Sequence, residues 1–570
     1  MHAYIPPPIY MNNKDIQIVF ASALAASAIS SCSSDSDDRQ HMNVIYIMCD
    51  DHSYQTISAY NRTLMHTPNI DRLSDEGYRF TNSFVANSLS GPSRACLLTG
   101  KHSHMNGFTN NEHGVFDNTQ MTFPKLLQKN GYETAVVGKW HLVTEPSGFT
   151  HWDILDGQGE YYQPVFICNG DTLLRQGYVT EVITEQAIDW MKNKRDKKKP
   201  FCLMIHHKAP HRSWMPDTQD LGSYDHVDFP LPETFDDNYQ GRTAALLQEM
   251  SIADDMNPAY DLKMADKDGK LVEPRWRWTL GMYRGGTEEG DELKAGRMDH
   301  VQQKAWNEYY DPIIERFRQD RLEGKDLAVW KYQRYLKDYC SVINSVDRNV
   351  GKIYEYLKNE GLLENTMIIY TSDQGFFMGE HGFFDKRFMY EESFRTPLII
   401  RLPDKLGRKR PAKSSKLVYG PDFGKGSHDI SEFVQNIDLA PTILEYAGVS
   451  IPEEIQGESF LGLMTGTPAE KMKTDTGEGW RDALYYHYYE YPAEHAVRRH
   501  YGIRTERYSL MHFYNDIDCW ELYDLKKDPL QIRNIYGTPE AEDILPELME
   551  KLHKLQKQYE DPIEKIACVK

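Results

Sequence analysis

Hydrophobic residues gather in short runs that fit strands covered on both faces. Five of these runs are Asn43–Cys49, Thr134–Gly138, Phe201–His206, Thr366–Thr371 and Pro397–Leu402. In these runs apolar residues occupy successive positions rather than every second position, which is typical of strands in a mostly parallel sheet. Apolar residues recur at helical spacing between the runs, most clearly over Cys340–Glu360, and Gly361 supplies a stop. Strands that alternate with helices predict an α/β fold, with a large mixed, mostly parallel sheet sandwiched by helices.

Polar side chains follow the ends of four of these runs. The groups are Asp50 and Asp51, Lys139 and His141, His206 to His211, and Asp373 and Gln374. In open α/β sheets, ligands bind beyond the carboxyl ends of the strands. The pattern therefore predicts that these four groups share one site.

The remaining segments show other patterns. Residues from about 249 to 334 are polar with little strand character and predict a largely helical insertion. The aromatic-rich tail has strand-like segments at Tyr485–Tyr491 and Tyr508–Phe513, followed by helical spacing over Ile544–Tyr559. We expect a leader and tether over residues 1–40 and a main, site-bearing domain over 41–470. A smaller C-terminal α+β domain, carrying an antiparallel sheet and closing over the site, is expected over 471–570.

The start of the chain resembles an export signal. In Met11–Ser31 a lysine precedes an apolar, alanine-rich run that is too short for a comfortable membrane span. Ile29 to Cys32 resembles the lipobox of bacterial lipoproteins, which implies cleavage before Cys32 and a lipid on its thiol. The acidic stretch Ser33–Asp38 resembles surface-export signals of some Gram-negative bacteria. We expect a lipoprotein in the periplasm or on the outer-membrane surface; an ordinary signal peptide with a chance cysteine is the alternative.

Composition narrows the possible partners. The formal net charge of -20 argues against a nucleic-acid-binding protein, because no basic face is built in. An anionic substrate stays possible, since salt screens exposed charges beyond roughly 10 Å and local cations can dominate a site. The cysteines form no CxxC pair or zinc pattern, and Cys49 and Cys202 lie in apolar runs as expected of buried small hydrophobes.

The segment from Ser90 to Gly100, SGPSRACLLTG, closely resembles the signature of the sulfatase family. In that family the first residue is oxidised to formylglycine, so the resemblance assigns this role to Ser90. A serine at this position implies maturation by an oxygen-independent radical enzyme. Pro92 and Ser93 suit a helix start, which would place Ser90 where a developing anion is favoured. Without the family resemblance, the segment would be a plain turn into a helix.

Carboxylates after two strands predict a metal site. Calcium prefers several oxygen ligands, mostly carboxylates, and the family pairs an aspartate with Asn, Gln or His at the position of Asp373 and Gln374. One calcium ion is expected, with Asp50, Asp51, Asp373, Gln374 and the modified Ser90 as its ligands. Helix capping and turn formation by aspartate are the alternative.

Further motifs resemble the family's sulfate-binding elements. Lys139-Trp140-His141 resembles Lys-x-His, which makes Lys139 a sulfate ligand and His141 a partner of the formylglycine hydrate. Ala209-Pro210-His211 resembles Ala-Pro-His, which places His211 on the sulfate. Lys386 matches the lysine ahead of the Tyr-Glu and Arg-x-Pro elements and would neutralise the bridging oxygen. His206 has a structural alternative, as a hydrogen-bonded core histidine.

The resemblance also implies a mechanism. One hydroxyl of the hydrated formylglycine attacks sulfur, and the other loses a proton, plausibly to His141, to expel sulfate. An unmodified serine would stay trapped as a sulfate ester. Arg94, Lys139, His211, Lys386 and the metal supply positive charge around the sulfuryl group, and His211 or Lys386 would protonate the leaving oxygen.

The C-terminal region gives the substrate expectation. Glu494–Thr505 and the surroundings of Asp385-Lys386-Arg387 are similar to bacterial N-acetylglucosamine-6-sulfatases. This implies a sulfated oligosaccharide, with 6-O-sulfated N-acetylglucosamine in a glycosaminoglycan or mucin-type glycan. The candidate sugar contacts are Asp385, His495, Arg498 and His500, and surface or salt-bridged roles remain open for each.

Three alternatives stay open. The first is a sulfatase for another position, such as a 2-O-sulfated uronate. The second is a phosphatase or phosphodiesterase of the alkaline-phosphatase superfamily with Ser90 as a plain nucleophile, although such enzymes usually carry an Asp-His where this chain has Asp373-Gln374. The third is an inactive glycan-binding lipoprotein, which the presence of every expected catalytic residue disfavours.

Overall fold

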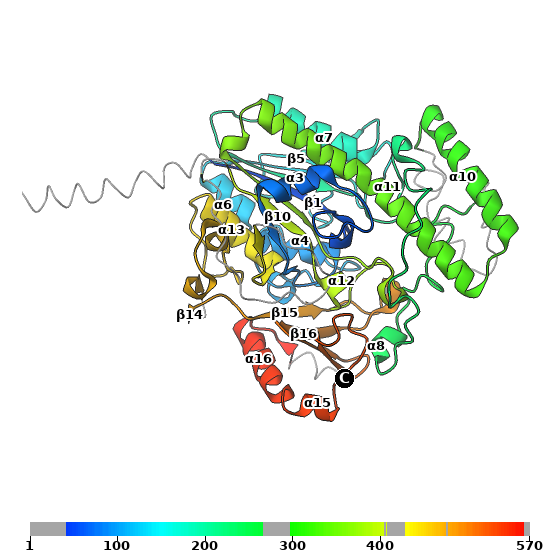
Figure 1. Cartoon of the computed structure of the whole chain (residues 1–570). Coiled ribbons are helices and arrows are strands. Elements are labelled where there is room, and N and C mark those ends of the chain that lie inside the picture. The colour runs from blue at the N-terminus through cyan, green and yellow to red at the C-terminus, as the bar shows by residue number, and fades with distance from the viewer. Residues whose placement is uncertain (1–41, 266–296, 404–405, 407–427, 475–476, 564–570) are drawn as a thin grey trace, which may run out of the picture.

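A ten-stranded sheet forms the centre of the larger part of the molecule (Figure 1). The computed structural model describes residues 42–265, 297–403, 406, 428–474 and 477–563. From edge to edge the sheet runs β11 (Asp429–Ile430), β2 (Tyr78–Phe80), β10 (Leu398–Arg401), β9 (Thr366–Ser372), β1 (Asn43–Cys49), β8 (Phe201–His207), β4 (Glu133–Gly138), β5 (His151–Leu155), β6 (Val165–Cys168) and β7 (Asp171–Leu174). The central strands β9, β1, β8, β4 and β5 are mutually parallel, which confirms the predicted mixed, mostly parallel sheet.

All five predicted strands are present: β1 has the predicted bounds, and no end of the other four is shifted by more than one residue. Strand β10 pairs antiparallel with β9, a direction that a continuous apolar run does not reveal. The edge strands β6 and β7 are also antiparallel additions. They were not predicted, because Val165–Cys168 and Asp171–Leu174 are short and partly or wholly exposed.

Helices cover both faces of the sheet, as the side chains of β1 show. Ile45 and Ile47 belong to a core cluster shared with helices α3, α7 and α11, whereas Val44 and Tyr46 belong to a second cluster shared with α4, α6 and α13. Alternate residues of a strand point to opposite faces, so a continuous apolar run requires both layers. The helices are α3 (Pro68–Glu76), α4 (Ser90–Thr99), α5 (Ser103–Asn106), α6 (Phe123–Lys129), α7 (Val179–Asp189), α8 (Thr243–Leu246), α12 (Glu391–Phe394), α13 (Leu439–Tyr446) and α14 (Leu461–Thr465).

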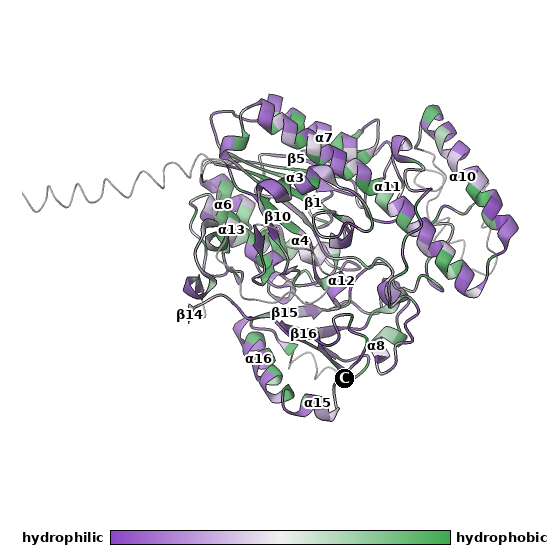
Figure 2. Ribbon diagram, viewed as in Figure 1, coloured by the Kyte–Doolittle hydropathy of each residue, from purple (hydrophilic) through white to green (hydrophobic). Residues whose placement is uncertain are grey.

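Two long helices extend from this layer (Figure 1). Helix α10 spans His300–Asp320. Asp299 caps its N-terminus, because the side chain of Asp299 accepts hydrogen bonds from backbone N–H groups of the first turn. Helix α11 spans Gly324–Asn359 and contains most of the predicted helix Cys340–Glu360. It also crosses residue 334, where the polar insertion was predicted to end, so that boundary falls inside a continuous helix. Polar and apolar residues alternate around both helices in Figure 2, as expected for helices packed on one side.

A separate four-stranded antiparallel sheet follows in the C-terminal region, as predicted. Its order is β15 (Ala483–Tyr488), β16 (His500–Thr505), β17 (Tyr508–Phe513) and β18 (Cys519–Asp524). One face, with Tyr486 and Met511, packs into the main core. The other, with Tyr485 and Leu510, packs beneath α16 (Leu545–Gln558), near the short helix α15 (Pro539–Glu542). The sheet therefore bridges the main core and the C-terminal helix.

The predicted leader, including Cys32, lies outside the described residues. Among those that are described, no helix combines the length and apolar character that a membrane span requires. Six cysteines in the described part carry free thiols, and Cys49 and Cys202 are buried as predicted.

Candidate active site

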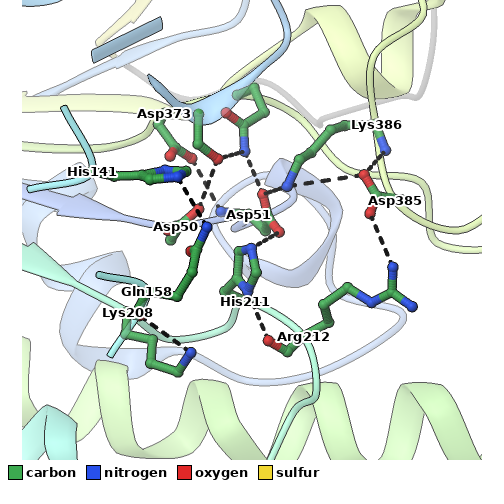
Figure 3. A network of polar contacts seen from close by, with 12 residues as sticks. Asp50, Asp51, His141, Gln158, Lys208, His211, Arg212, Asp373, Asp385 and Lys386 are labelled. Carbon is green, nitrogen blue, oxygen red and sulfur yellow. Dashed lines mark hydrogen bonds and ion pairs between the residues drawn. The ribbon is translucent and has the colours of Figure 1, made fainter. Parts of the chain in front are cut away.

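Strand register brings the predicted polar groups to one edge of the sheet. Cys49 pairs with Ser372 on β9 and with His207 on β8, so Asp50 and Asp373 leave neighbouring strands at the same level. Gly138 pairs with His206, which places Lys139 at the same edge. The predicted convergence of these strand ends is therefore observed (Figure 3).

Ser90 is the first residue of α4 and is buried at this edge. Its Oγ lies 3.1 Å from Asp50 Oδ1 and 3.5 Å from Gln374 Nε2. Gly91 fits because a Cβ there would lie 2.4 Å from the ring of Phe108. The helix start that was predicted from Pro92 and Ser93 is present, and it sets Ser90 among carboxylates and amide groups.

We call the group of Ser90, Asp50, Asp51, Asp373, Gln374, Lys139 and Lys386 the Asp50 cluster. Its two lysines pair with its first two carboxylates: Lys139 Nζ contacts Asp50 Oδ2, and Lys386 Nζ contacts Asp51 Oδ1. The side chains of both aspartates are fully buried. Opposite charges are thus held together in a water-poor site, where their interaction is strong.

The electrostatics of the carboxylates favour an added cation. Burial raises the pKa of Asp51 to about 7 and the pKa of Asp373 to about 6. Burial acts in the same sense on Asp50, but nearby cations, Lys139 first, hold the pKa of Asp50 well below its ordinary value. Asp51 Oδ2 and Gln374 Oε1 are buried and accept no hydrogen bond from the residues that the structure describes. Buried oxygen donors of this kind fit a hard divalent cation such as calcium.

Arg94 ties the carboxylates to the sheet. Its Nη2 lies 3.0 Å from Asp373 Oδ2 and 3.5 Å from Asp50 Oδ2, and its Nη1 donates to the carbonyl of Lys139 at 2.9 Å. The described contacts of Arg94 are with protein groups, so it orients the cluster and adds positive charge behind it.

Two predicted histidines lie at the margin of the cluster. His211 Nε2 lies 3.8 Å from Asp51 Oδ2, and its Nδ1 donates to the carbonyl of Arg212 at 2.7 Å. His141 Nε2 accepts a hydrogen bond from Gln158 Nε2 at 2.9 Å. Burial lowers the pKa of both histidines well below the ordinary value, so both imidazoles are neutral near pH 7. The side chain of His211 is 16% exposed, which leaves its outer edge open to solvent.

His206 and His207 are core residues. His206 is buried, and its Nδ1 donates to the carbonyl of Lys139 at 3.1 Å, which confirms the alternative of a hydrogen-bonded core histidine. His207 is fully buried between the sheet and α7 and is not part of the Asp50 cluster.

A second group, the Asp385 cluster, comprises Asp385, Arg212, Arg387, Glu494 and His495. Arg387 Nη1 pairs with Asp385 Oδ1, and His495 Nε2 lies 3.1 Å from Asp385 Oδ2. Arg212 Nη1 lies 2.6 Å from Glu494 Oε1 and 3.9 Å from Asp385 Oδ2. The side chain of Glu494 is 42% exposed, so this cluster also reaches solvent. Its charges are balanced internally.

Lys386 joins the two clusters. Its Nζ contacts Asp51 and lies 3.9 Å from Asp385 Oδ1, and Figure 3 shows it between the two carboxylates. Burial alone would raise the pKa of Asp385. The positive charges of Arg387 and Lys386 outweigh burial and hold this pKa well below its ordinary value. A ligand that spans both clusters would therefore meet Lys386 in the middle.

Two predicted sugar contacts are not part of the Asp385 cluster. His500 is fully buried, its Nε2 accepts from the backbone of Met389 at 3.1 Å, and its Nδ1 donates to the carbonyl of Arg498 at 2.8 Å. Both ring nitrogens of His500 serve the backbone, which favours a structural role, and a sugar-binding role for His500 stays a prediction. The guanidinium of Arg498 donates to the carbonyl of Leu247 at 3.0 Å and lies over the ring of Tyr491. The binding role of Arg498 stays a prediction.

Sequence reasoning missed four residues of the site. Arg212, Arg387 and Glu494 directly adjoin the predicted His211, Lys386 and His495, so adjacency to a predicted site residue was the available signal. Gln158 follows β5, a strand that was not predicted, and no motif pointed to it.

Comparison with known proteins agrees with this geometry. The family model described as Sulfatase matches residues 42–449, and one described as N-sulphoglucosamine sulphohydrolase, C-terminal, matches residues 379–558. The chain belongs to the sulfatase family. It is accordingly a sulfuric ester hydrolase, and Ser90 occupies the position of the family signature.

Two relatives bear on the substrate of this sulfatase. An N-acetylglucosamine-6-O-sulfatase of Bacteroides thetaiotaomicron is 46% identical over 94% of this chain and 90% of its own length. A solved structure described as a complex with its substrate D-glucosamine-2-N,6-O-disulfate is 46% identical, with a TM-score of 0.81 over 92% of this chain and 99% of that one. A phosphonate monoester hydrolase of Agrobacterium radiobacter, 19% identical with a TM-score of 0.60 over 91% and 96%, shares the fold alone.

Proposed function

We propose that this sulfatase removes the 6-O-sulfate from N-acetylglucosamine, or a closely related glucosamine, in a glycosaminoglycan or mucin-type glycan. The observation that carries the proposal is the 46% identity to an N-acetylglucosamine-6-O-sulfatase over nearly the whole of both chains. The proposed carbohydrate specificity is consistent with the Asp385 cluster, whose charged groups lie beside the Asp50 cluster and reach solvent through Glu494.

The Asp50 cluster would bind the sulfate end. Asp50, Asp51, Asp373, Gln374 and the modified Ser90 would hold one calcium ion, whose charge would stabilise the anionic oxygens of the reacting group. Formylglycine made from Ser90 would supply the nucleophile in its hydrated form. A radical maturase that acts without oxygen would make this modification.

The chain's own residues would position the ester and handle protons. Lys139 and Lys386 would direct their ammonium groups toward the sulfuryl oxygens, and Arg94 adds positive charge behind the carboxylates. His211 is neutral, reaches toward solvent and donates through Nδ1 to a backbone carbonyl. Its Nε2 would deliver a proton to the leaving sugar oxygen only from the imidazolium form, which the negative charge of the bound sulfate would favour; Lys386 is the alternative proton donor. His141 Nε2 is the candidate acceptor for the proton released later, and Gln158 would then turn its amide oxygen to that nitrogen in place of its NH2 group.

The Asp385 cluster would bind the sugar. Asp385 offers carboxylate oxygens and Arg212 offers guanidinium nitrogens close by, while His495, whose Nδ1 donates to the carbonyl of Glu249, would orient Asp385 through Nε2. Sugar hydroxyls both donate and accept hydrogen bonds, so a mixed set of this kind can orient a ring. Lys386 lies between the clusters and would meet the bridging oxygen.

The alternatives are less well supported. Two-zinc phosphatases need a histidine-rich second metal site, whereas the metal-ligand group described at this edge combines the carboxylates of Asp50 and Asp51 with one histidine, His211. The solved structure of a 2-O glycosaminoglycan sulfatase shares only 19% identity, with a TM-score of 0.60 over 92% of this chain and 94% of that one. Export as a lipoprotein, lipidated at Cys32 and held in the periplasm or on the outer surface of a Gram-negative cell, remains part of the proposal.

The test is sulfate release by protein with confirmed formylglycine at Ser90. The substrates are 6-O-sulfated N-acetylglucosamine and a disaccharide with a 2-O-sulfated uronate. Release from the glucosamine alone is expected. Release from the uronate alone would retain a sulfatase and overturn the proposed substrate, and release of phosphate from phosphate esters by unmodified protein would support the phosphatase.

A further inference from the structure

Three side chains of metal-ligand type meet on one face of the large sheet. His151 and Asp153 are the first and third residues of β5, so their side chains point to the same face. Cys168 pairs directly with Asp153 across the antiparallel ladder between β5 and β6. Ligand atoms from the three residues lie within 4.8 Å of one another.

This group is distinct from the Asp50 cluster. Strand β5 runs parallel to β4, with His151 beside Ala135 and Ile154 beside Gly138. The Asp50 cluster lies beyond the carboxyl ends of the parallel strands, whereas His151 and Asp153 lie within β5, level with Ala135 and Val137 of β4. The three residues are therefore inside β5 and β6, toward one edge of the sheet, and not at the strand ends that carry the Asp50 cluster.

The carboxylate of Asp153 has an unused coordination position. Its side chain is fully buried, and Arg175 Nη2 binds Oδ2 at 2.7 Å. Within the described part of the chain, Oδ1 accepts no hydrogen bond. Leaving a buried polar atom unsatisfied is unfavourable, so an additional ligand at Oδ1 would be stabilising. Arg175 would then hold the other oxygen as an outer partner.

The other two side chains are suited to metal binding. Burial lowers the pKa of His151 to about 4, so its imidazole is neutral near pH 7, the form that binds metals. Asn169 Nδ2 donates to His151 Nδ1 at 3.1 Å, a bond that a metal at this nitrogen would replace. His151 and Cys168 are only half-buried, which gives an ion access from solvent.

We propose that His151, Asp153 and Cys168 bind a divalent transition metal, with zinc as the best-fitting ion. Imidazole, carboxylate and thiolate are the ligands that zinc takes, whereas calcium prefers oxygen donors. On binding, the proton of the Cys168 thiol goes to solvent, a sulfur–zinc bond forms, and water completes the tetrahedral shell.

The site would stabilise the segment that supports His141. Zinc would join β5 to β6, and the connection between these strands carries Gln158, which donates to His141 in the Asp50 cluster. Its role is structural, because no ligand of the site touches the reacting groups.

Cobalt is a suitable probe, because thiolate ligation to Co²⁺ gives a charge-transfer absorption in the near ultraviolet. The full chain, cleared of transition metals and kept in calcium, is titrated with Co²⁺. We expect one equivalent to produce the band, and Zn²⁺ to remove it. Cys168→Ser should lose the band, whereas the control Cys519→Ser, which alters another half-buried free thiol, should retain it.

A second variant tests the imidazole. His151→Gln should weaken Zn²⁺ binding, measured by competition with a chromogenic chelator, by more than about tenfold. Absence of the cobalt band in the wild-type protein, its persistence in Cys168→Ser, or unchanged Zn²⁺ affinity in His151→Gln would each overturn the proposal. Because sulfate release is not the readout, these outcomes are independent of the proposed substrate.

Discussion

The Asp50 and Asp385 clusters lie side by side and share Lys386, yet they are built in different ways. The Asp50 cluster follows the ends of parallel strands, and its buried carboxylates have raised pKa values at Asp51 and Asp373. The Asp385 cluster comes from segments that connect strands and helices, and arginines balance its carboxylates. The first is poised to take up further positive charge, whereas the second is already neutralised.

This difference suits the two clusters to different roles: the Asp50 cluster to the reaction at sulfur, and the Asp385 cluster to recognition of the sugar. Residues at strand ends are fixed by the ladder of the sheet, which suits groups that must hold a metal and a sulfuryl group in one geometry. Residues from loops can vary without disturbing that geometry, which suits recognition of a particular sugar. Changes in the first cluster should therefore affect turnover of every substrate, and changes in the second only that of sugars.

Ser90→Ala should have the largest effect. Loss of the nucleophile should lower turnover by at least about 10⁴-fold, measured as sulfate release. The melting temperature should change little, because the hydroxyl's hydrogen bonds to described residues are those with Asp50 and Gln374. Ser147→Ala, which alters a half-buried serine bonded to a backbone carbonyl, is the matched control. Full activity in Ser90→Ala would remove Ser90 from the chemistry.

Removal of calcium should come next. Dialysis against a calcium chelator should abolish most activity and lower the melting temperature, because the carboxylates of Asp51 and Asp373 would lose their compensating charge. Added Ca²⁺ should restore both readouts. An enzyme that keeps full activity after exhaustive chelation would contradict the metal assignment.

Lys139→Ala and His211→Ala should each lower kcat by roughly 10²–10³-fold, with a much smaller change in KM. Both side chains contact the carboxylates of the Asp50 cluster rather than the Asp385 cluster. The loss should therefore be similar for a sulfated sugar and for a small aryl sulfate. Lys199→Ala, which removes an exposed lysine paired with Glu133, is the control. Unchanged turnover in either variant would place that residue outside the site.

Asp385→Asn should distinguish the role of the Asp385 cluster from that of the Asp50 cluster. Loss of a hydrogen bond to a charged group should lower kcat/KM for the sulfated glucosamine by roughly 10- to 100-fold. An aryl sulfate without a sugar should be hydrolysed nearly as before. Equal losses on both substrates would show that Asp385 acts through Lys386 on the chemistry instead.

His500→Gln should affect stability and leave turnover intact. Burial lowers the pKa of His500 to about 3, against 6.5 in the unfolded chain. The unfolded chain therefore binds more protons below about pH 6.5, so this contribution to stability is present above that pH and is lost as the pH falls toward 3. Between about pH 7.5 and pH 5 the loss is about 2 kcal/mol.

The variant should therefore melt at a lower temperature at about pH 7.5, because Gln does not reproduce both backbone bonds. It should also lose less stability on acidification than the wild-type protein. Thermal melts at the two pH values check this, and a large rise in KM for the sugar would identify His500 as a sugar contact.

Much of the Asp50 cluster could be predicted from the sequence, because its residues directly follow apolar runs. Asp50, Lys139 and Asp373 each lie at the end of such a run. The parallel register of the strands then brings these ends to one edge of the sheet. The partners of Asp385 could not be predicted in the same way. Arg212 and Glu494 are 282 positions apart, and their contact depends on how the C-terminal sheet packs on the core.

Where the structure differs from the expectations drawn from the sequence, the difference has a physical cause. His500 lies in a segment that resembles substrate-binding sequences, yet β16 places it inside the sheet interface. The direction of β10 and the edge strands β6 and β7 depend on long-range pairing, which a local hydropathy pattern does not encode. Gln158 is part of the site because β5 directs the loop that follows it toward His141.

The central claim is that sulfate release depends on conversion of Ser90 to formylglycine. The direct test is to prepare protein with graded conversion, measure the converted fraction of the Ser90 peptide by mass spectrometry, and measure sulfate release from 6-O-sulfated N-acetylglucosamine on the same samples. The account predicts that the rate is proportional to the converted fraction and vanishes with it. Full sulfate release by protein in which Ser90 is entirely unmodified would contradict it.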